Sequence, residues 1–177
     1  MRVLVCFLLL LFSTSAVAAD RFPDVPARNL AKQELRLPAA FTHDFNVVFV
    51  VFARNQQDEV ESWIPLFSEV GKDRDDVQYW QASLMGTMGK ALRAIVEGAM
   101  RGAIKEPDRR ERFFLLYGDK APILTGLGEP DDEHLLMLLV DRDGAVLWRA
   151  SGPRAPASEA ALRTAIQRPE MSAPPTP

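Results

Sequence analysis

The feature that most constrains the fold is the apolar segment VVFVVFA, which runs from Val47 to Ala53. It is rich in Val and Phe and shows no alternation of polar and apolar residues. A strand with this composition is typically covered on both faces. We therefore expect it to be a central strand of an α/β sheet.

The polar residues after this strand predict the start of a helix. Asn55 is the expected N-cap, and Asp58 and Glu59 suit the positive end of the helix dipole. Pro65 lies within the helix and predicts a kink, and Gly71 is a natural stop. The apolar residues follow at helical spacing: Val60, Trp63, Ile64, Phe67 and Val70.

The rest of the domain predicts alternating strands and helices. The segment NLAKQELRLP, which ends at Pro38, indicates a small hairpin or two short strands. Asp141 to Gly144 reads as the turn of an antiparallel hairpin. Strands are expected over residues 77–82, 112–117, 135–140 and 145–150, helices over 87–104 and 157–167, and a short helix or loop over 119–126.

The helix expected over residues 87–104 combines two faces. Arg93, Glu97 and Arg101 share one face at i, i+4 spacing. Glycines at 86, 89, 98 and 102 lower its intrinsic helicity, so close packing or partial irregularity should compensate. Methionines at 85, 88 and 100 indicate either core packing or an adaptable binding surface. The neighbouring stripe is apolar: Met88, Ala91, Leu92, Ile95 and Ala99.

The chain begins with the pattern of a secretory signal peptide: Arg2, an apolar run from Val3 to Phe12, and small residues up to Ala19. We expect residues 1–19 to be the signal, 20–167 one domain, and 168–177 a disordered tail. An uncleaved signal anchor is the alternative. With the signal removed, we expect no integral membrane span and a periplasmic or secreted protein.

Cysteine content and charge exclude several function classes. The only cysteine is Cys6, inside the predicted signal, so the processed protein should have no disulfide, thiolate nucleophile or cysteine metal site. Loss of Arg2 reduces Lys plus Arg from 21 to 20 against 24 Asp plus Glu, a net charge of −4. This balance argues against nucleic acid as a partner.

Three segments carry a family resemblance: VVFVVFARNQQDEVESW, MRGAIKEPDRRERFFLLYGDKAPILTGLG and HLLMLLVDRDGAVLWRASG. Together with the order of elements, they resemble the thioredoxin-like family that includes the mitochondrial ATP synthase assembly factor and its bacterial relatives. The resemblance covers roughly residues 22–162. It implies a thioredoxin-like α/β fold with a central mixed β-sheet flanked by helices, and a role in assembly.

The resemblance also implies where a thiol pair would lie. Redox-active thioredoxin-like proteins place it just after the central strand, where the helix N-terminus lowers the thiol pKa. The matching residues here are Arg54, Asn55, Gln56 and Gln57, none of which can exchange electrons. His134 and Leu135 stand where redox members carry a proline, so neither feature of the redox site is carried over.

Several residues are candidate binding positions. The loop from Arg54 to Gln57 is either an anion site at a helix N-terminus or a capped loop without chemistry. Trp148 is either an interface anchor or a cover for one sheet face. His43 and His134 would have to converge to bind a metal, and we expect surface histidines instead.

The basic run from Glu106 to Arg112 is either a phosphate or acidic-partner patch or a self-paired charge run. No catalytic residue, metal or cofactor is expected, since no nucleophile elbow, metalloprotease motif or phosphate loop is present.

Three hypotheses follow for the function. The first is a non-redox thioredoxin-like protein of the cell envelope that binds a protein client, as an assembly or folding factor, for a membrane complex such as ATP synthase. The second is a small-ligand or anion-binding module. The third is an enzyme of unrecognised chemistry.

Overall fold

The computed structural model describes residues 21–70, 74–128 and 132–167. The predicted signal peptide and C-terminal tail lie outside these residues. The chain forms a mixed sheet of seven strands in the order β2-β1-β5-β4-β3-β6-β7. The strands are β1 (Val25–Asn29), β2 (Glu34–Leu37), β3 (Phe45–Val51), β4 (Val77–Gly86), β5 (Phe113–Tyr117), β6 (Leu136–Val140) and β7 (Val146–Ser151).

The strand β3 is an interior strand of the sheet, between β4 and β6, as the apolar segment predicts. All of its residues are buried. It pairs in parallel with β4 and antiparallel with β6, while β4 continues in parallel with β5. The carboxyl ends of β3, β4 and β5 therefore lie side by side at one end of the strands, together with the start of β6.

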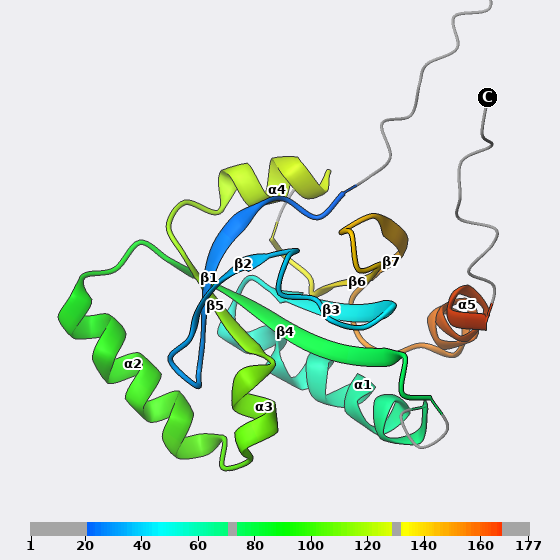
Figure 1. Ribbon diagram of the computed structural model, residues 1–177, viewed down its shortest axis with the longest axis horizontal. Helices are drawn as coiled ribbons and strands as arrows, with labels where there is room; N and C mark the ends of the chain where they lie inside the picture. Colours follow the sequence, from blue (N-terminus) through cyan, green and yellow to red (C-terminus); the bar gives the residue numbers. More distant parts are fainter. Residues whose placement is uncertain (1–20, 71–73, 129–131, 168–177) are drawn as a thin grey trace, which may run out of the picture.

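The helices cover both faces of this sheet (Figure 1), with α4 on one side and α1, α2, α3 and α5 on the other. Their bounds are α1 (Gln57–Val70), α2 (Lys90–Ala103), α3 (Pro107–Glu111), α4 (Ala121–Leu127) and α5 (Pro156–Gln167). No helix within the described ranges has both the length and the apolar character needed to cross a bilayer.

Alternate residues of β3 belong to two separate cores. Val47, Phe49 and Val51 pack with the buried residues of α1 and α5. Val48 and Val50 pack on the opposite face, with α4 and the segment before β3. Because the side chains of a strand alternate between its faces, one strand supports both layers.

One local prediction about a helix end is wrong. Residues Arg54–Gln56 form a short 3-10 helix, η1, so Asn55 lies inside it and does not cap α1. Pro107 begins α3 at the first helical position, where its missing N–H costs nothing. Pro65 lies within α1, and the kink expected there stays a prediction.

The helix α2 shows its apolar face to solvent. Glu97 is its only buried residue. Leu92 and Ile95 are 52% and 69% exposed. The glycine prediction holds for Gly86, which ends β4 with a positive φ, and for Gly89, the extended residue before α2. It is wrong for Gly98 and Gly102, because α2 is continuous there and an added Cβ would meet nothing within 4 Å. Intramolecular packing therefore does not account for these glycines.

A buried carboxylate holds α2 against the sheet. The Tyr117 hydroxyl donates to Glu97 Oε1 at 2.9 Å, and Arg101 Nη1 donates to Glu97 Oε2 at 3.4 Å. Arg28 Nε, which is buried without a hydrogen-bond partner, lies 3.5 Å from Glu97 Oε2 as an ion pair. The Arg93 guanidinium covers the Tyr117 ring at 4.2 Å. Charged and polar groups thus fix which side of α2 faces inward.

We predict that Tyr117 titrates late in the folded protein. Burial, followed by the adjacent Glu97 carboxylate, raises the pKa of Tyr117 from 10.0 to about 12, while Arg93 and Arg28 oppose this shift. The folded pKa exceeds the unfolded one, so the contribution of Tyr117 to stability is present below pH 10 and is lost between about pH 10 and 12.

The chain has two tyrosines, so Tyr79→Phe leaves Tyr117 as the single reporter in near-ultraviolet phenolate absorbance. In this background Glu97→Gln should lower the midpoint, with the part due to burial remaining. A midpoint near 10 in protein that circular dichroism shows to be folded would contradict the prediction.

Candidate functional site

The first candidate site lies at the carboxyl ends of the parallel strands β3, β4 and β5. Here η1 follows β3, Lys120 follows β5, and Asp132 to His134 precede β6. This is the edge at which α/β sheets commonly carry their binding residues. Five of the predicted residues lie at this end of the sheet: Arg54 to Gln57 and His134.

Gln56 ties this edge together and is 1% exposed. Its Oε1 accepts hydrogen bonds from the backbone N–H groups of Phe52 at 2.8 Å and Ala53 at 3.2 Å. Its Nε2 donates to the backbone oxygen of Asp132 at 2.9 Å. One side-chain amide thus satisfies groups from both loops, which identifies Gln56 as a structural residue.

Lys120 makes a second link between the same loops. Its Nζ donates to the backbone oxygen of Phe52 at 2.6 Å and to Asp132 Oδ2 at 2.9 Å. This hydrogen bond and the charge of Lys120 hold the pKa of Asp132 below its usual range. Sequence analysis did not identify Lys120 as a residue of this site, because its partners Phe52 and Asp132 lie on distant segments.

The geometry disfavours an anion at the start of α1. The N–H groups of Phe52 and Ala53 already donate to Gln56, and Asp58 and Glu59 occupy the first turn. Glu59 Oε2 also accepts from the N–H of Leu135 at 3.2 Å. These carboxylates already complement the helix dipole. The exposed Arg54 and Asn55 remain as surface groups beside a rigid loop.

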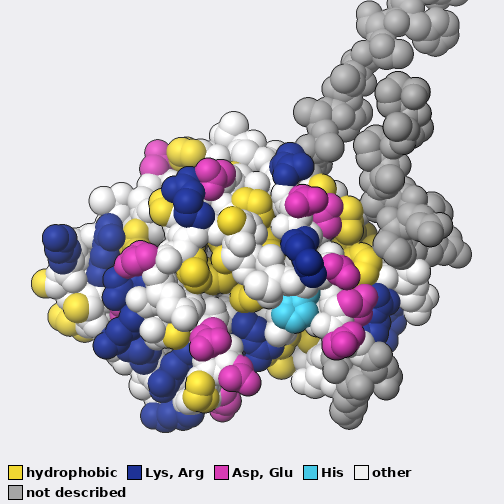
Figure 2. All heavy atoms as spheres, in the orientation of Figure 1, with side chains coloured by type: hydrophobic (Ala, Val, Ile, Leu, Met, Phe, Trp, Pro, Cys, Tyr) yellow, Lys and Arg dark blue, Asp and Glu magenta, His cyan; other side chains and the backbone are white. Residues whose placement is uncertain are grey.

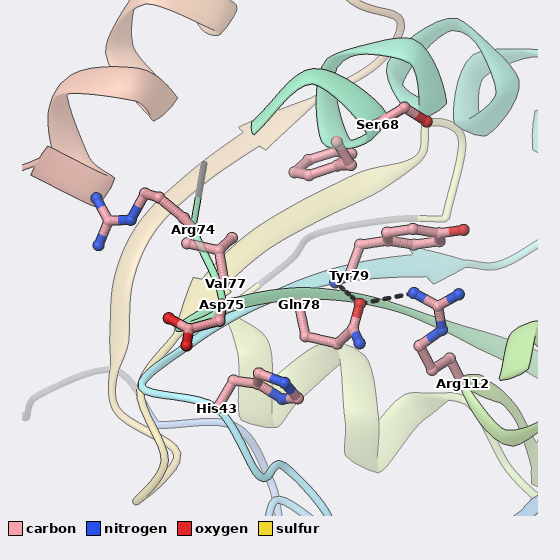
Figure 3. Close-up of a pocket in the computed structure, with 9 residues that line it drawn as sticks. His43, Ser68, Arg74, Asp75, Val77, Gln78, Tyr79 and Arg112 are labelled. Carbon is pink, nitrogen blue, oxygen red and sulfur yellow. Dashed lines mark hydrogen bonds between the residues drawn. The ribbon is translucent and has the colours of Figure 1, made fainter. Parts of the chain in front are cut away.

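The second candidate site is a hollow at the opposite end of these strands, where β3, β4 and β5 begin (Figure 3). It has a volume of about 540 Å³, and its lining includes His43, Arg74, Gln78, Tyr79 and Arg112. A neighbouring hollow of about 550 Å³ shares His43, Gln78 and Arg112. The three shared residues therefore stand between the two hollows.

Arg112 is the cation of this site that lacks a carboxylate partner among the described residues. Its Nη1 donates to Gln78 Oε1 at 2.6 Å and its Nε to the backbone oxygen of Asp108 at 3.1 Å. Its guanidinium covers the Tyr79 ring at 4.5 Å. By contrast, Arg74 is paired with Asp76, whose pKa it lowers. Asp75 lines the same hollow and likewise has no ion-pair partner among the described residues, so the hollow holds one unpaired cation, Arg112, and one unpaired anion.

The other predicted residues do not gather at one place. His43 precedes β3 and the exposed His134 lies beyond its far end, so the two histidines do not converge. No group of three metal-ligating side chains occurs within the described parts of the chain. Trp148 packs, partly buried, against the core under α1 and α5, which favours its role as a cover for the sheet.

In the basic run, Arg110 donates to the backbone oxygens of Ile104 and Arg101 at 2.7 and 2.8 Å. Arg110 therefore serves the chain's own structure. Sequence analysis identified the basic run from Glu106 to Arg112 and, separately, His43. It could not show that His43 and Arg112 line the same hollow. Their approach depends on the pairing of β3, β4 and β5.

Comparison with solved structures identifies the fold. A protein assigned as thiol:disulfide interchange protein DsbE from Chlorobium tepidum has a TM-score of 0.53 at 16% identity, covering 84% of this chain and 94% of the other. The exposed lipoprotein thioredoxin Etrx1 from Streptococcus pneumoniae strain TIGR4 has a TM-score of 0.51 at 13% identity, covering 82% and 99%. The chain therefore has a thioredoxin-like fold, as the resemblance implied.

BsSco, a member of the Sco family of cytochrome c oxidase assembly proteins, has a TM-score of 0.55 at 13% identity, covering 85% of this chain and 95% of the other. No protein-family model and no curated protein matches the sequence. These similarities establish the fold alone, and none of the three proteins compared is described in terms of ATP synthase.

We predict that Gln56→Leu destabilises the protein by roughly 2–3 kcal/mol, because it leaves buried backbone groups of both loops without their partner. Arg54→Ala, on the same loop but exposed, should change the free energy of unfolding by less than about 0.5 kcal/mol. Urea unfolding of both variants measures the difference. Equal stabilities would show that Gln56 does not tie the two loops together.

Proposed function

We propose that this chain is a non-redox, thioredoxin-like protein of the cell envelope that acts by binding a protein client, as an assembly or folding factor. The observation that carries the proposal is the loop from Arg54 to Gln57. At the position where redox-active proteins of this fold carry their thiols, Gln56 uses its amide to join two loops. The only cysteine of the chain, Cys6, lies in the predicted signal.

Two comparisons support parts of this proposal. BsSco belongs to a family of cytochrome c oxidase assembly proteins, so a thioredoxin-like fold occurs in assembly factors. Etrx1 is an exposed lipoprotein, which agrees with the envelope location that the signal peptide predicts. ATP synthase as the client is a narrower hypothesis, and it rests on the sequence resemblance alone.

The proposal predicts that the purified protein lacks thiol-disulfide exchange activity and recovers a reproducible partner from cells. Insulin reduction with dithiothreitol should proceed at the rate seen without the protein. Crosslinking in intact cells, followed by purification through a C-terminal tag, should yield the same envelope protein in independent preparations. Catalysed exchange, or recovery of the processed protein alone, would contradict the proposal.

The Arg112 hollow favours anion binding as a second candidate function. Arg112 lacks a carboxylate partner among the described residues and borders both hollows, so a phosphate or carboxylate would complete its hydrogen bonds. This shifts the anion hypothesis from the Arg54 loop to the opposite edge of the sheet. An enzymatic role is the third hypothesis, and no group of described residues supports a mechanism for it.

If this second function holds, inorganic phosphate should raise the melting temperature of the wild type and of Arg54→Gln, but not of Arg112→Gln. A ligand at about a hundred times its dissociation constant stabilises the native state by about 2.7 kcal/mol, which differential scanning fluorimetry detects. An undiminished shift in Arg112→Gln would remove the hollow from consideration. Loss of the shift in Arg54→Gln alone would return the anion to the loop.

A further inference from the structure

A third hollow, between α2 and the strands β1 and β5, belongs to neither candidate site. It has a volume of about 470 Å³. Its apolar lining combines two exposed and two buried residues: Pro26, Ala94, Ala27 and Leu115. Its charged lining contains, among the described residues, three cations and two carboxylates: Arg28, Lys90, Arg93, Glu34 and Glu97. The hollow therefore combines apolar surface with a surplus of positive charge.

Both carboxylates of the hollow already have cationic partners. Arg28 pairs with both, with Nη1 2.5 Å from Glu34 Oε1 and Nε 3.5 Å from Glu97 Oε2. Arg101 adds a second cation, its Nη1 3.4 Å from Glu97 Oε2. The Tyr117 hydroxyl donates to the other oxygen of Glu97 at 2.9 Å. Two cations thus balance two carboxylates, and Glu97 presents no uncompensated negative charge to the hollow.

Lys90 and Arg93 supply the surplus charge. Neither has a carboxylate partner among the described residues, and Lys90 is exposed at the first position of α2. Arg93 is held in place, because its Nε donates to the backbone oxygen of Met88 at 2.8 Å and its guanidinium covers the Tyr117 ring at 4.2 Å. Its two terminal nitrogens donate to no described residue. A guanidinium fixed in position therefore keeps donors for a ligand.

The start of α2 adds no anion near these cations. Its N-cap is Gly89, which makes no side-chain hydrogen bond, and its first turn contains no acidic residue. Figure 2 shows Lys and Arg side chains gathered on the side where Figure 1 places α2. Because a cleft lined by charges of one sign focuses the field, this hollow should attract a negatively charged ligand.

The size and the apolar lining of the hollow indicate which anion fits. Its volume is that of sites that enclose molecules of many atoms, far larger than a phosphate ion. Phosphate at Lys90 and Arg93 would also leave Pro26 and Ala94 in contact with water. A peptide with Asp or Glu beside small apolar residues would bond the guanidinium through its carboxylates and cover the apolar lining as well. The hollow therefore favours an acidic protein segment over a small inorganic anion.

We propose that the hollow between α2 and β1 binds an acidic segment of the client protein, with Asp or Glu carboxylates at Lys90 and Arg93 and small apolar side chains against Pro26 and Ala94. The proposal deepens the proposed function, on which it rests, because it names the surface that the client would contact. The attraction is largely electrostatic, so the affinity should fall as the salt concentration rises.

The test uses the purified protein and a labelled synthetic peptide that alternates Glu with Ala. Fluorescence anisotropy at low salt should show saturable binding, and a twin peptide with Gln in place of Glu should bind at least about tenfold more weakly. Lys90→Gln/Arg93→Gln should lower the affinity for the acidic peptide by about tenfold. Lys90→Gln alone should lower it by about threefold and should leave the fold unchanged, because Lys90 is exposed and bonds no described side chain.

Lys32→Gln/Lys105→Gln removes the same charge at exposed positions outside the hollow and should bind the acidic peptide like the wild type. Equal binding of the two peptides, an equal loss of affinity in this control, or unchanged affinity in Lys90→Gln/Arg93→Gln would overturn the proposal. It would also be overturned, in favour of a small anion, if the peptide does not bind while inorganic phosphate raises the melting temperature of the wild type but not of Lys90→Gln/Arg93→Gln.

The variant Lys90→Gln/Arg93→Gln also separates this proposal from the proposed function. If the client crosslinked in cells is recovered with this variant as well as with the wild type, the client binds elsewhere. The proposed function then stands while the assignment of the surface fails. Failure to recover a reproducible client with the wild type would instead contradict the proposed function itself.

Discussion

The burial of β3 on both faces is the constraint on which the rest of the structure depends. Its alternate side chains support two cores, so α1 and α5 must lie on one side of the sheet and α4 on the other. Polar groups are buried at both ends of β3. Asn46 accepts from Trp80 Nε1 at 2.9 Å and donates to the backbone oxygen of His43 at 2.6 Å. Gln56 bonds the backbone beyond the other end, so both edges of the sheet are held in place.

The role of Gln56 changes how the loop after β3 should be understood. A reactive group at this edge needs access to solvent and to its substrate. Gln56 is instead buried and engages the loop before β6, while Lys120 bonds the same two segments. The edge at which α/β sheets often carry chemistry is here occupied by structural hydrogen bonds. A candidate binding feature therefore lies elsewhere, at the hollow beside Arg112 where β3, β4 and β5 begin.

The sequence predicts the elements well where periodicity decides them. The apolar run of β3, the spacing of α1 and the Asp-Gly hairpin all correspond to observed structure. Periodicity could not predict the direction of α2, because an amphipathic helix has two faces and the pattern alone does not say which is buried. The answer depends on Arg28 and Tyr117, which reach Glu97 from other strands. Likewise, local sequence favours Asn55 as a cap, but Asn55 lies inside η1, and it is Gln56 that bonds the N–H groups of Phe52 and Ala53 before η1.

The energetics of α2 show what its orientation costs the folded chain. Burial of side chains such as Ile95 and Leu92 contributes roughly 1.5–3 kcal/mol each, and replacing an interior glycine by alanine contributes about 1 kcal/mol. The folded chain forgoes these gains and buries a carboxylate, whose desolvation must be offset by its bonds to Tyr117 and Arg101 and the Arg28 ion pair. A helix with so few apolar contacts to its own domain opens at lower free energy than β3.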